Sequence, residues 1–409
     1  MACTWHSSNK VVGKYGYNSH IFDMSKTDKQ ERKKLIRLTT SDISLWSLLV
    51  GQLRFMNQYY DVVGVSADTG LLHQVAAREG VRVEAVPMHR EISLAADWAC
   101  LKTLIALFRK ERPYIVHANT PKGSLLAMIA AKVVGVPHRV YTVTGLRYQG
   151  ATGLFRFILQ TMERISCFCA TKVIPEGEGV KRALQLDHIT GKPLQVVNHG
   201  NINGKDTAYW SPAACRETKE EVRARLQLET SDFVFVFVGR VVRDKGMHEL
   251  ARAMQRLKAD YPQCKLILVG GLEPDLDPLD PADEQYFRTD SSVRYVGEQK
   301  DVRPYLLAAD ALVFPSYREG FPNVVLEAGA MGLPSIVTDI NGCNEIIIPE
   351  KNGTIIPPKD AEALYRAMKR FLDAPAEVAK MAAEARPLIQ SRYEQRDVWE
   401  ALLQTYRSL

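Results

Sequence analysis

The sequence predicts an α/β protein with two doubly wound parallel sheets. Its 409 residues exceed what one hydrophobic core usually supports, and 46% of them are hydrophobic, which suffices for two cores. In each half of the chain, short apolar strands alternate with longer stretches of helical periodicity. This alternation indicates parallel strands, because parallel neighbours need a long crossover connection, which is usually a helix.

The first series of elements follows a polar stretch without pattern, residues 1–33, which we expect to be a loose N-terminal extension with Met24 as an alternative start. Ser41-Asp42 supplies a cap for the first predicted helix. Strands are expected at 35–39, 61–65, 81–86, 114–117 and 139–142, and helices at 45–59, 71–79, 95–111 and 123–134.

The second series begins at 233–238, an unbroken apolar strand of the kind that is buried on both sheet faces. Further strands are expected at 265–269, 293–296 and 311–314. The Gly- and Asn-rich stretch 200–206 and Trp210-Ser211-Pro212 read as a linker between the two series. We therefore expect one domain at 34–206, a second at 207–390 and a C-terminal helix at 391–409, whose apolar stripe is Val398, Leu402, Leu403 and Tyr406.

The two halves differ in charge. Residues 1–205 contain 27 Lys and Arg against 15 Asp and Glu, a net charge of +12, whereas the remainder contains 26 against 32, a net charge of −6. A basic half suits nucleic acid, anionic lipid or a phosphorylated substrate, and a solvated basic surface is the alternative.

Seven cysteines without metal-site or disulfide spacing favour a reducing cytosol. No apolar run approaches the ~20 residues that span a bilayer, and a signal peptide is not recognisable. If a membrane is involved, we expect the protein to lie on its surface.

Two cations follow the strand at 233–238. Gly239-Arg240 stands at its carboxyl end, and Asp244-Lys245-Gly246 precedes a helix that begins near Met247. Ligands of open α/β sheets bind at the carboxyl ends of strands, where Arg, Lys and a helix N-terminus suit a diphosphate. A solvated Arg and Lys beside a turn is the alternative. The segment lacks the glycine order of dinucleotide and P-loop motifs, so neither a dehydrogenase nor an ATPase is favoured.

Two carboxylates, Glu319 and Glu327, stand eight residues apart after the strand at 311–314. Glu319 is expected in a loop and Glu327 in the first turns of a helix at 326–331, so that both carboxylates reach one ligand and accept hydrogen bonds from sugar hydroxyls. Main-chain amides in the segment between them, Phe321-Pro322-Asn323-Val324, suit the phosphates of that ligand. By spacing alone, two solvent-exposed carboxylates would be the default.

Arg240 with Lys245, followed by Glu319-x7-Glu327 inside Glu-Gly-Phe-Pro-Asn-Val-Val-Leu-Glu-Ala, resembles the donor site of the retaining GT-B glycosyltransferases of family four. The resemblance covers residues 35–409 and implies two Rossmann-like domains that face a central cleft, with the C-terminal helix crossing back to the first domain. It implies that Arg240 and Lys245 bind the donor diphosphate, that Glu319 contacts the transferred sugar as a catalytic residue, and that Glu327 contacts the ribose. Gly297, before Asp301-Val302-Arg303, resembles the family's base-binding segment.

The resemblance adds a third segment, Val116-His117-Ala118-Asn119-Thr120-Pro121-Lys122-Gly123, at the end of a buried strand. Family members commonly carry His-x-His-x-Pro here, and Asn119 replaces the second His. An amide hydrogen-bonds a sugar hydroxyl but does not titrate near neutrality, so Asn119 is the expected sugar contact and His117 either a catalytic group or a satisfied core histidine. Lys122 and Arg147, in or beside the acceptor-side loop 144–150, are expected either to attract an acceptor phosphate or to be solvated.

The segment 86–92 and the His-x-Asn-Thr-Pro-Lys-Gly stretch are similar to bacterial enzymes of capsule, exopolysaccharide or lipid-linked oligosaccharide synthesis. This implies transfer of a hexosyl or N-acetylhexosaminyl group from a UDP-sugar, with no metal and no cofactor, to a polyprenyl-diphosphate-linked sugar at the inner face of the cytoplasmic membrane. The basic N-terminal half suits such a surface.

Three alternatives stay open. A sugar-nucleotide 2-epimerase of the same architecture would need no acceptor, and a non-catalytic scaffold is conceivable because Asn119 replaces a histidine. A nucleic-acid binder rests on charge alone, without basic motifs interleaved with aromatic residues, so we expect no nucleic-acid partner.

Overall fold

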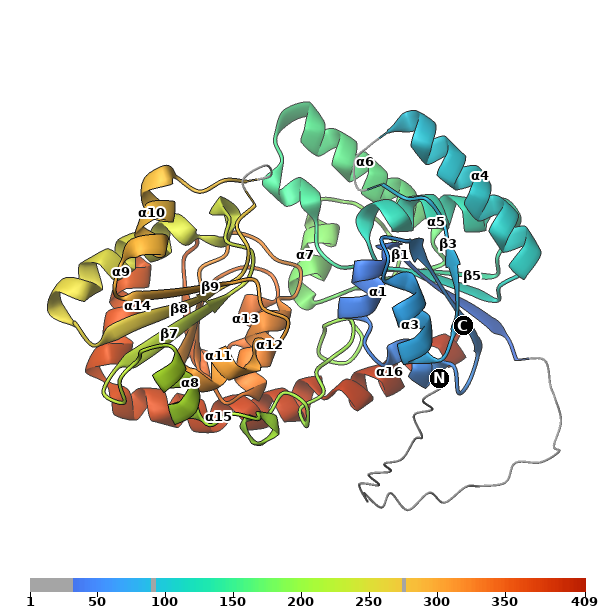
Figure 1. Ribbon diagram of the computed structural model, residues 1–409. Coiled ribbons are helices and arrows are strands. Elements are labelled where there is room, and N and C mark those ends of the chain that lie inside the picture. Colours follow the sequence, from blue (N-terminus) through green and yellow to red (C-terminus); the bar gives the residue numbers. More distant parts are fainter. Residues whose placement is uncertain (1–31, 90–92, 274–276) are drawn as a thin grey trace, which may run out of the picture. The chain divides into compact units, whose positions relative to one another are not determined.

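The computed structural model describes residues 32–89, 93–273 and 277–409 (Figure 1). Residues 33–409 form one compact unit. The predicted N-terminal extension lies outside the described residues apart from positions 32 and 33, and so do residues 90–92 of the segment 86–92.

The first sheet has six parallel strands in the order β3-β2-β1-β4-β5-β6. Its strands are β1 Lys34–Ser41, β2 Asp61–Ala67, β3 Arg82–Ala85, β4 Ile115–Ala118, β5 His138–Val143 and β6 Lys172–Pro175. The register pairs Ile36 of β1 with Val63 of β2 on one side and with Val116 of β4 on the other. The strand order reverses between β1 and β4, which makes their carboxyl ends the place where an open sheet binds ligands.

The second sheet is also fully parallel and repeats this topology in the order β12-β11-β10-β7-β8-β9. Its strands are β7 Phe233–Val238, β8 Cys264–Val269, β9 Val293–Gly297, β10 Ala311–Phe314, β11 Ser335–Thr338 and β12 Gly353–Ile356. The order reverses between β7 and β10. The predicted fold class, two doubly wound parallel sheets, is confirmed. The predicted boundary between residues 206 and 207 falls between the sheets and stays a prediction.

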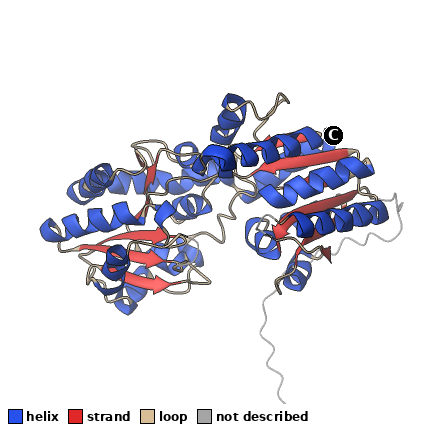
Figure 2. Cartoon of the chain, turned by 90° about the horizontal axis from the view of Figure 1, so that it is seen from above, coloured by secondary structure: helices blue, strands red, loops and turns tan. Residues whose placement is uncertain are grey.

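Helices flank both groups of strands (Figure 2). In the first half they are α1 Asp42–Leu48, α2 Gln52–Met56, α3 Leu72–Glu79, α4 Leu94–Glu111, α5 Pro121–Val134, α6 Gly153–Cys169 and α7 Glu178–Leu186, with the 3-10 helix η1 Arg147–Gly150. Buried residues of α4, α5 and α6 share one apolar cluster with the strands, and those of α2 and α3 share another. The first sheet is therefore covered on both faces.

In the second half of the chain the helices are α8 Lys219–Arg225, α9 Met247–Asp260, α10 Pro281–Thr289, α11 Arg303–Ala308, α12 Asn323–Ala330, α13 Cys343–Ile346, α14 Ala361–Asp373, α15 Pro375–Tyr393 and α16 Gln395–Arg407, with the 3-10 helices η2 Pro212–Ala214 and η3 Arg243–Lys245. The last helix belongs to the first half by its packing, because Leu402, Leu403 and Tyr406 lie in the cluster of α2 and α3.

The single helix predicted at 45–59 is wrong. Two short helices, α1 and α2, stand in its place, separated by Gly51 with a φ of 78°. A Cβ atom at Gly51 would lie 2.6 Å from the Trp399 ring of α16, so the break makes room for the returning helix. The helix expected at 326–331 begins earlier, at Asn323, because Pro322 occupies its N-cap position.

Candidate functional site

Three glycines end neighbouring strands of the second sheet. Gly239 follows β7, Gly270 follows β8, and Gly297 is the last residue of β9. Gly270 has a φ of 143°, and a Cβ atom there would lie 1.7 Å from the Gly239 carbonyl oxygen, so no side chain fits. The Gly270 amide donates to the Gly297 carbonyl at 2.8 Å. This edge of the sheet is bare backbone that a ligand can approach closely. Gly270 was missed, although Gly270-Gly271 directly follows an apolar strand.

Arg240 and Lys245 stand at this edge. The half-exposed Arg240 places Nη1 2.7 Å from Oε2 of Glu273. Lys245, in the 3-10 helix η3, donates from Nζ to Oε1 of Glu319. Gly246, the N-cap of α9, has a φ of 72°, and a Cβ atom there would lie 2.1 Å from the Pro315 carbonyl oxygen. Both predicted donor-binding cations are therefore held by carboxylates at the strand ends.

Glu319 lies in the loop after β10, as expected. Its Oε1 accepts from Ser316 Oγ at 3.0 Å in addition to Lys245. The loops after β7 and β10, the two strands at the reversal of strand order, thereby meet through Lys245 and Glu319. The structure brings together these two residues, which the sequence places 74 positions apart.

Glu327 lies one turn inside α12, and its Oε1 is 2.6 Å from Nζ of Lys205. Lys205 is buried, and its main chain bonds on both sides to the junction of α15 and α16, accepting from the Gln395 amide and donating to the Tyr393 carbonyl. Lys205 was read only as part of the linker. No local signal separates it from the other residues there.

The segment between the two carboxylates faces the linker in part. Phe321 is buried, with its ring centroid 5.7 Å from that of Tyr393. The side-chain oxygen of Asn323 accepts from Nδ2 of Asn201 at 3.2 Å. Pro322 is the N-cap of α12, and Val324 is half-buried in its first turn. The side chains of Phe321 and Asn323 fix the loop, which leaves main-chain groups as its means of ligand contact.

Asn119 follows β4, at the reversal of strand order in the first sheet. It is fully buried, and neither Nδ2 nor Oδ1 has a hydrogen-bond partner. Its carbonyl accepts from Thr144 Oγ1 at 2.6 Å, and a Cβ atom on Gly320 would lie 2.3 Å from the Thr144 carbonyl oxygen. Through Thr144, the Asn119 segment therefore lies next to the loop of Glu319. A buried amide without partners costs free energy, which marks it as a candidate ligand contact.

Glu176 was missed by the sequence reading. It follows β6 and is buried, and burial together with the neighbouring carboxylates Glu319 and Glu345 raises its pKa to about 8. Glu345 of α13 accepts from the amides of Glu178 at 2.6 Å and Gly179 at 2.9 Å. The signal, Glu176-Gly177 after an apolar run, went unused because the strand itself was not predicted.

Comparison with known proteins shows the family of the chain. The family model described as glycosyl transferases group 1 matches residues 218–387, and the one described as glycosyl transferase 4-like matches residues 46–176. Together they cover the second sheet and all of the first sheet except β1. The chain belongs to this family of glycosyltransferases.

Two relatives and one solved structure illustrate the similarity. A capsular polysaccharide biosynthesis glycosyltransferase of Staphylococcus aureus, CapM, is 29% identical over 92% of this chain and 98% of its own length. An Escherichia coli UDP-Gal:alpha-D-GlcNAc-diphosphoundecaprenol alpha-1,3-galactosyltransferase is 29% identical over 78% of this chain and 81% of its own. The crystal structure of HepE from Anabaena with UDP and glucose matches with a TM-score of 0.78 at 18% identity, over 92% of this chain and 100% of the other. That structure supports the GT-B fold.

Of the two expectations for His117 of this glycosyltransferase, a catalytic group or a satisfied core histidine, the structure agrees with the second. Its ring is buried between Thr142 Oγ1, 2.7 Å from Nε2, and the Tyr406 hydroxyl, 2.5 Å from Nδ1. Burial and the nearby Arg37 guanidinium lower its pKa well below the usual histidine value. Both nitrogens are occupied by neighbours from β5 and α16, so His117 supports the strand end that carries Asn119.

Lys122 and Arg147 differ in setting. Lys122 is not the exposed cation that was expected: it is buried in the first turn of α5, with Nζ 2.6 Å from Asp97 of α4. Arg147 is exposed at the start of η1, as expected. Only Arg147 is therefore freely accessible from solvent.

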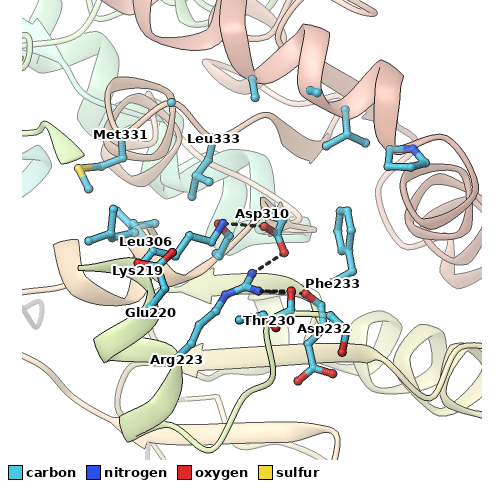
Figure 3. Close-up of a pocket in the computed structure, with 18 residues that line it drawn as sticks. Lys219, Glu220, Arg223, Thr230, Asp232, Phe233, Leu306, Asp310, Met331 and Leu333 are labelled. Atoms are coloured by element: carbon cyan, nitrogen blue, oxygen red, sulfur yellow. Dashed lines mark hydrogen bonds and ion pairs between the residues drawn. The ribbon is translucent and has the colours of Figure 1, made fainter. Parts of the chain in front are cut away.

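A hollow of about 630 Å³ lies at the amino ends of β7 and β10, away from these residues (Figure 3). Asp310 joins two cations there, with Oδ1 2.7 Å from Lys219 and Oδ2 2.7 Å from Arg223. Because these charges are paired and the hollow lies at the opposite strand ends, we assign the site to the carboxyl edge.

Proposed function

We propose that the glycosyltransferase moves a hexosyl or N-acetylhexosaminyl group from a UDP-sugar, with retention of configuration, to a hydroxyl of a polyprenyl-diphosphate-linked sugar. The observation that carries the proposal is the pairing of Lys245 with Glu319 at the carboxyl edge of β7 and β10, beside Arg240.

In the proposed donor complex, the diphosphate takes the place of carboxylates as the partner of Lys245 and Arg240. Both cations and the bare backbone at Gly239 then stabilise the charge that grows on the leaving diphosphate. Glu319, freed from Lys245, accepts hydrogen bonds from the transferred sugar, and Glu327 accepts from the ribose. Gly297 borders the base.

Asn119 completes the sugar contacts in this proposal. Its buried amide has both a donor and an acceptor to spare, which suits one sugar hydroxyl. Because an amide does not titrate near neutrality, Asn119 orients the sugar and carries no proton. His117 acts as a positioning residue behind it.

The proposed acceptor rests on the two relatives above, one named for capsule synthesis and the other for a diphosphoundecaprenol-linked sugar. Arg147, exposed beside the Thr144 loop, is placed to meet the acceptor diphosphate. We accordingly propose that the protein works at the inner face of the cytoplasmic membrane.

We propose that transfer needs neither a metal ion nor a cofactor, because Arg240 and Lys245 supply the positive charge. The sequence does contain an Asp-x-Asp tripeptide, Asp275-Leu276-Asp277. Asp277 is its one described residue, and Oδ2 there accepts from the Asp244 amide at 2.7 Å, which supports the turn before Lys245. The test of the proposed function therefore includes removal of divalent metal ions with a chelator.

The test combines donor binding with transfer. Calorimetric titration with UDP, GDP and ADP is expected to favour UDP, and Arg240→Ala is expected to weaken UDP binding. Arg288→Ala is the matched control, since Arg288 is equally exposed and also paired with one carboxylate, Glu284. Transfer from labelled UDP-sugars to undecaprenyl-diphosphate-linked sugars is expected to persist in EDTA. NMR of the product is expected to show that the transferred sugar keeps the anomeric configuration it had in the donor.

Other outcomes separate the alternatives. Conversion of a UDP-sugar to its epimer without acceptor would replace the proposal by the epimerase, and absence of binding to any nucleotide would favour the scaffold. Loss of transfer in EDTA, restored by a divalent cation, would overturn metal independence alone.

A further inference from the structure

An apolar stripe runs along the outer face of α6. Leu154, Phe157 and Phe168 are 74%, 60% and 70% exposed, and Ile158 and Ile165 are also exposed. Large apolar side chains so exposed and so close together mark interaction surfaces on soluble proteins. We call Leu154, Phe157, Ile158, Thr161, Ile165 and Phe168 the α6 stripe.

The spacing of the α6 stripe places its members on one side of the helix, since each member lies three or four positions from another member. The opposite side, with Leu159 and Ser166, is buried against the first sheet. A helix that is apolar on both sides normally has both covered. The one polar member, Thr161, donates its hydroxyl proton to the Phe157 carbonyl oxygen at 2.8 Å, so the stripe presents few hydrogen-bonding groups to water.

Cations border the α6 stripe. Within α6, Arg156 and Arg164 are the charged residues besides Glu163, which is buried and accepts from the Tyr141 hydroxyl at 2.7 Å. Lys132 of α5 lies 3.5 Å from the centre of the Phe168 ring. The edge of the stripe at Arg164 and Lys132 is thus positive, whereas Arg156 lies on the side of the buried Glu163 and is paired with Asp187 at 3.3 Å.

The stripe also lies close to the site along the chain. The helix begins directly after η1, and a Cβ atom on Gly145, just before η1, would lie 3.3 Å from Cα of Gly320 in the loop of Glu319. On its other side, α5 packs between α6 and α4, whose Trp98 is exposed (Figure 1). One continuous helical layer therefore carries the stripe and leads to the acceptor side.

We infer that the α6 stripe docks on an anionic lipid bilayer, with its aromatic side chains among the acyl chains and Arg164 and Lys132 at the head groups. Among the described residues, no helix is both long and apolar enough to cross a membrane. A second copy fits less well, because stripe-to-stripe contact would bring these cations against themselves. The inferred bilayer contact of the α6 stripe does not depend on the proposed function. Only its link to a lipid-linked acceptor rests on that function.

The experiment is flotation of the full chain with phosphatidylglycerol or phosphatidylcholine vesicles. Wild type is expected to bind phosphatidylglycerol more tightly, less so at high salt. Phe157→Gln/Phe168→Gln is expected to lower the partition coefficient about tenfold or more, because two aromatic side chains no longer enter the bilayer. Ile43→Gln/Ile348→Gln, at two exposed apolar positions away from α6, is the matched control and is expected to bind as wild type.

Equal vesicle binding by the two double variants would overturn the inference. It would also be overturned if the wild-type protein formed a dimer that does not bind vesicles and the Phe157→Gln/Phe168→Gln variant were monomeric. UDP titration of the same variants keeps the two proposals apart. Vesicle binding without UDP binding leaves the docking surface standing while the donor site fails, and UDP binding without vesicle binding does the reverse.

Discussion

At the scale of single residues, the site is a set of charges paired with one another across loops. Lys245 holds Glu319, Arg240 holds Glu273, and Glu327 holds Lys205. In the proposed donor complex, a diphosphate would compete with the carboxylates for the first two cations, and until then the carboxylates keep these cations in position. Binding would exchange one charged partner for another, with little reorganisation.

Lys245→Met is expected to lower kcat/KM for transfer about 10²-fold, because one preorganised cation is removed from the leaving diphosphate. Steady-state kinetics at varied UDP-sugar check this. Lys369→Met, an exposed lysine paired with Asp373 on α14, is the control and is expected to keep the wild-type rate. An unchanged kcat/KM in Lys245→Met would remove Lys245 from the proposed site.

Glu176 makes the stability of the protein depend on pH. Burial, Glu319 and Glu345 raise its pKa from 4.5 to about 8 in the folded chain, so the folded state keeps a proton that the unfolded state releases. The contribution of protonated Glu176 to the free energy of unfolding is fully present below pH 4.5 and is lost as the pH rises to about 8. Glu176→Gln, which cannot titrate, is therefore expected to lose less thermal stability than wild type between about pH 5 and about pH 9.

Melting temperatures across this range, followed by differential scanning fluorimetry, check the sign. The exposed carboxylate variant Glu217→Gln is expected to follow wild type. If Glu176→Gln declines as steeply as wild type, Glu176 is already ionised in the folded protein near neutrality.

At the scale of elements, the alternation of apolar strands and periodic helices sufficed for most of the first sheet and for four strands of the second. It failed at β6, because Lys172–Pro175 has only two apolar residues, Val173 and Ile174, before a proline, and proline is unfavourable in a strand. It also failed at 45–59, where the helix is broken at Gly51. Only a residue without a side chain leaves room there for the ring of Trp399, which lies more than three hundred residues later in the sequence. Such breaks depend on long-range packing, which a local window does not contain.

The last helix is expected to stabilise the first sheet's domain. Leu403 of α16 is buried with residues of α2 and α3, so Leu403→Ala is expected to cost about 2–5 kcal/mol. Urea unfolding followed by tryptophan fluorescence measures this. Leu154→Ala makes the same chemical change at an exposed position and is expected to change stability by less than about 0.5 kcal/mol. Equal effects would mean that α16 is not part of this core.

At the scale of the whole molecule, the sequence motifs pointed to the groups that we propose as ligand contacts, whereas the groups that hold them came only from the structure. Arg240, Lys245 and Glu319 follow strands in recognisable local patterns. Lys205, Glu176 and Glu345 acquire their partners from distant loops, and nothing in their neighbours along the chain indicates those partners. His117 shows the converse, a motif residue whose surroundings are closed by Tyr406 from the far end of the chain.

Glu345 is expected to tie the two halves of the chain together. From α13 its carboxylate accepts from the amides of Glu178 and Gly179 at the start of α7, where the helix dipole also favours negative charge. Glu345→Ala removes this acceptor, so these amides are expected to exchange with deuterium about tenfold faster, since a hydrogen bond to a charged group is worth about 1.5–3 kcal/mol.

Mass spectrometry of peptides that cover residues 176–186 measures this exchange. Glu345→Gln retains one acceptor oxygen and is expected to give an intermediate rate. Glu350→Ala, an exposed carboxylate paired with Arg370, controls for loss of charge and is expected to leave the exchange of these peptides unchanged. If exchange in Glu345→Ala equals wild type, other contacts hold α7 against the second half, and the buried pair of Phe321 and Tyr393 becomes the next set to vary.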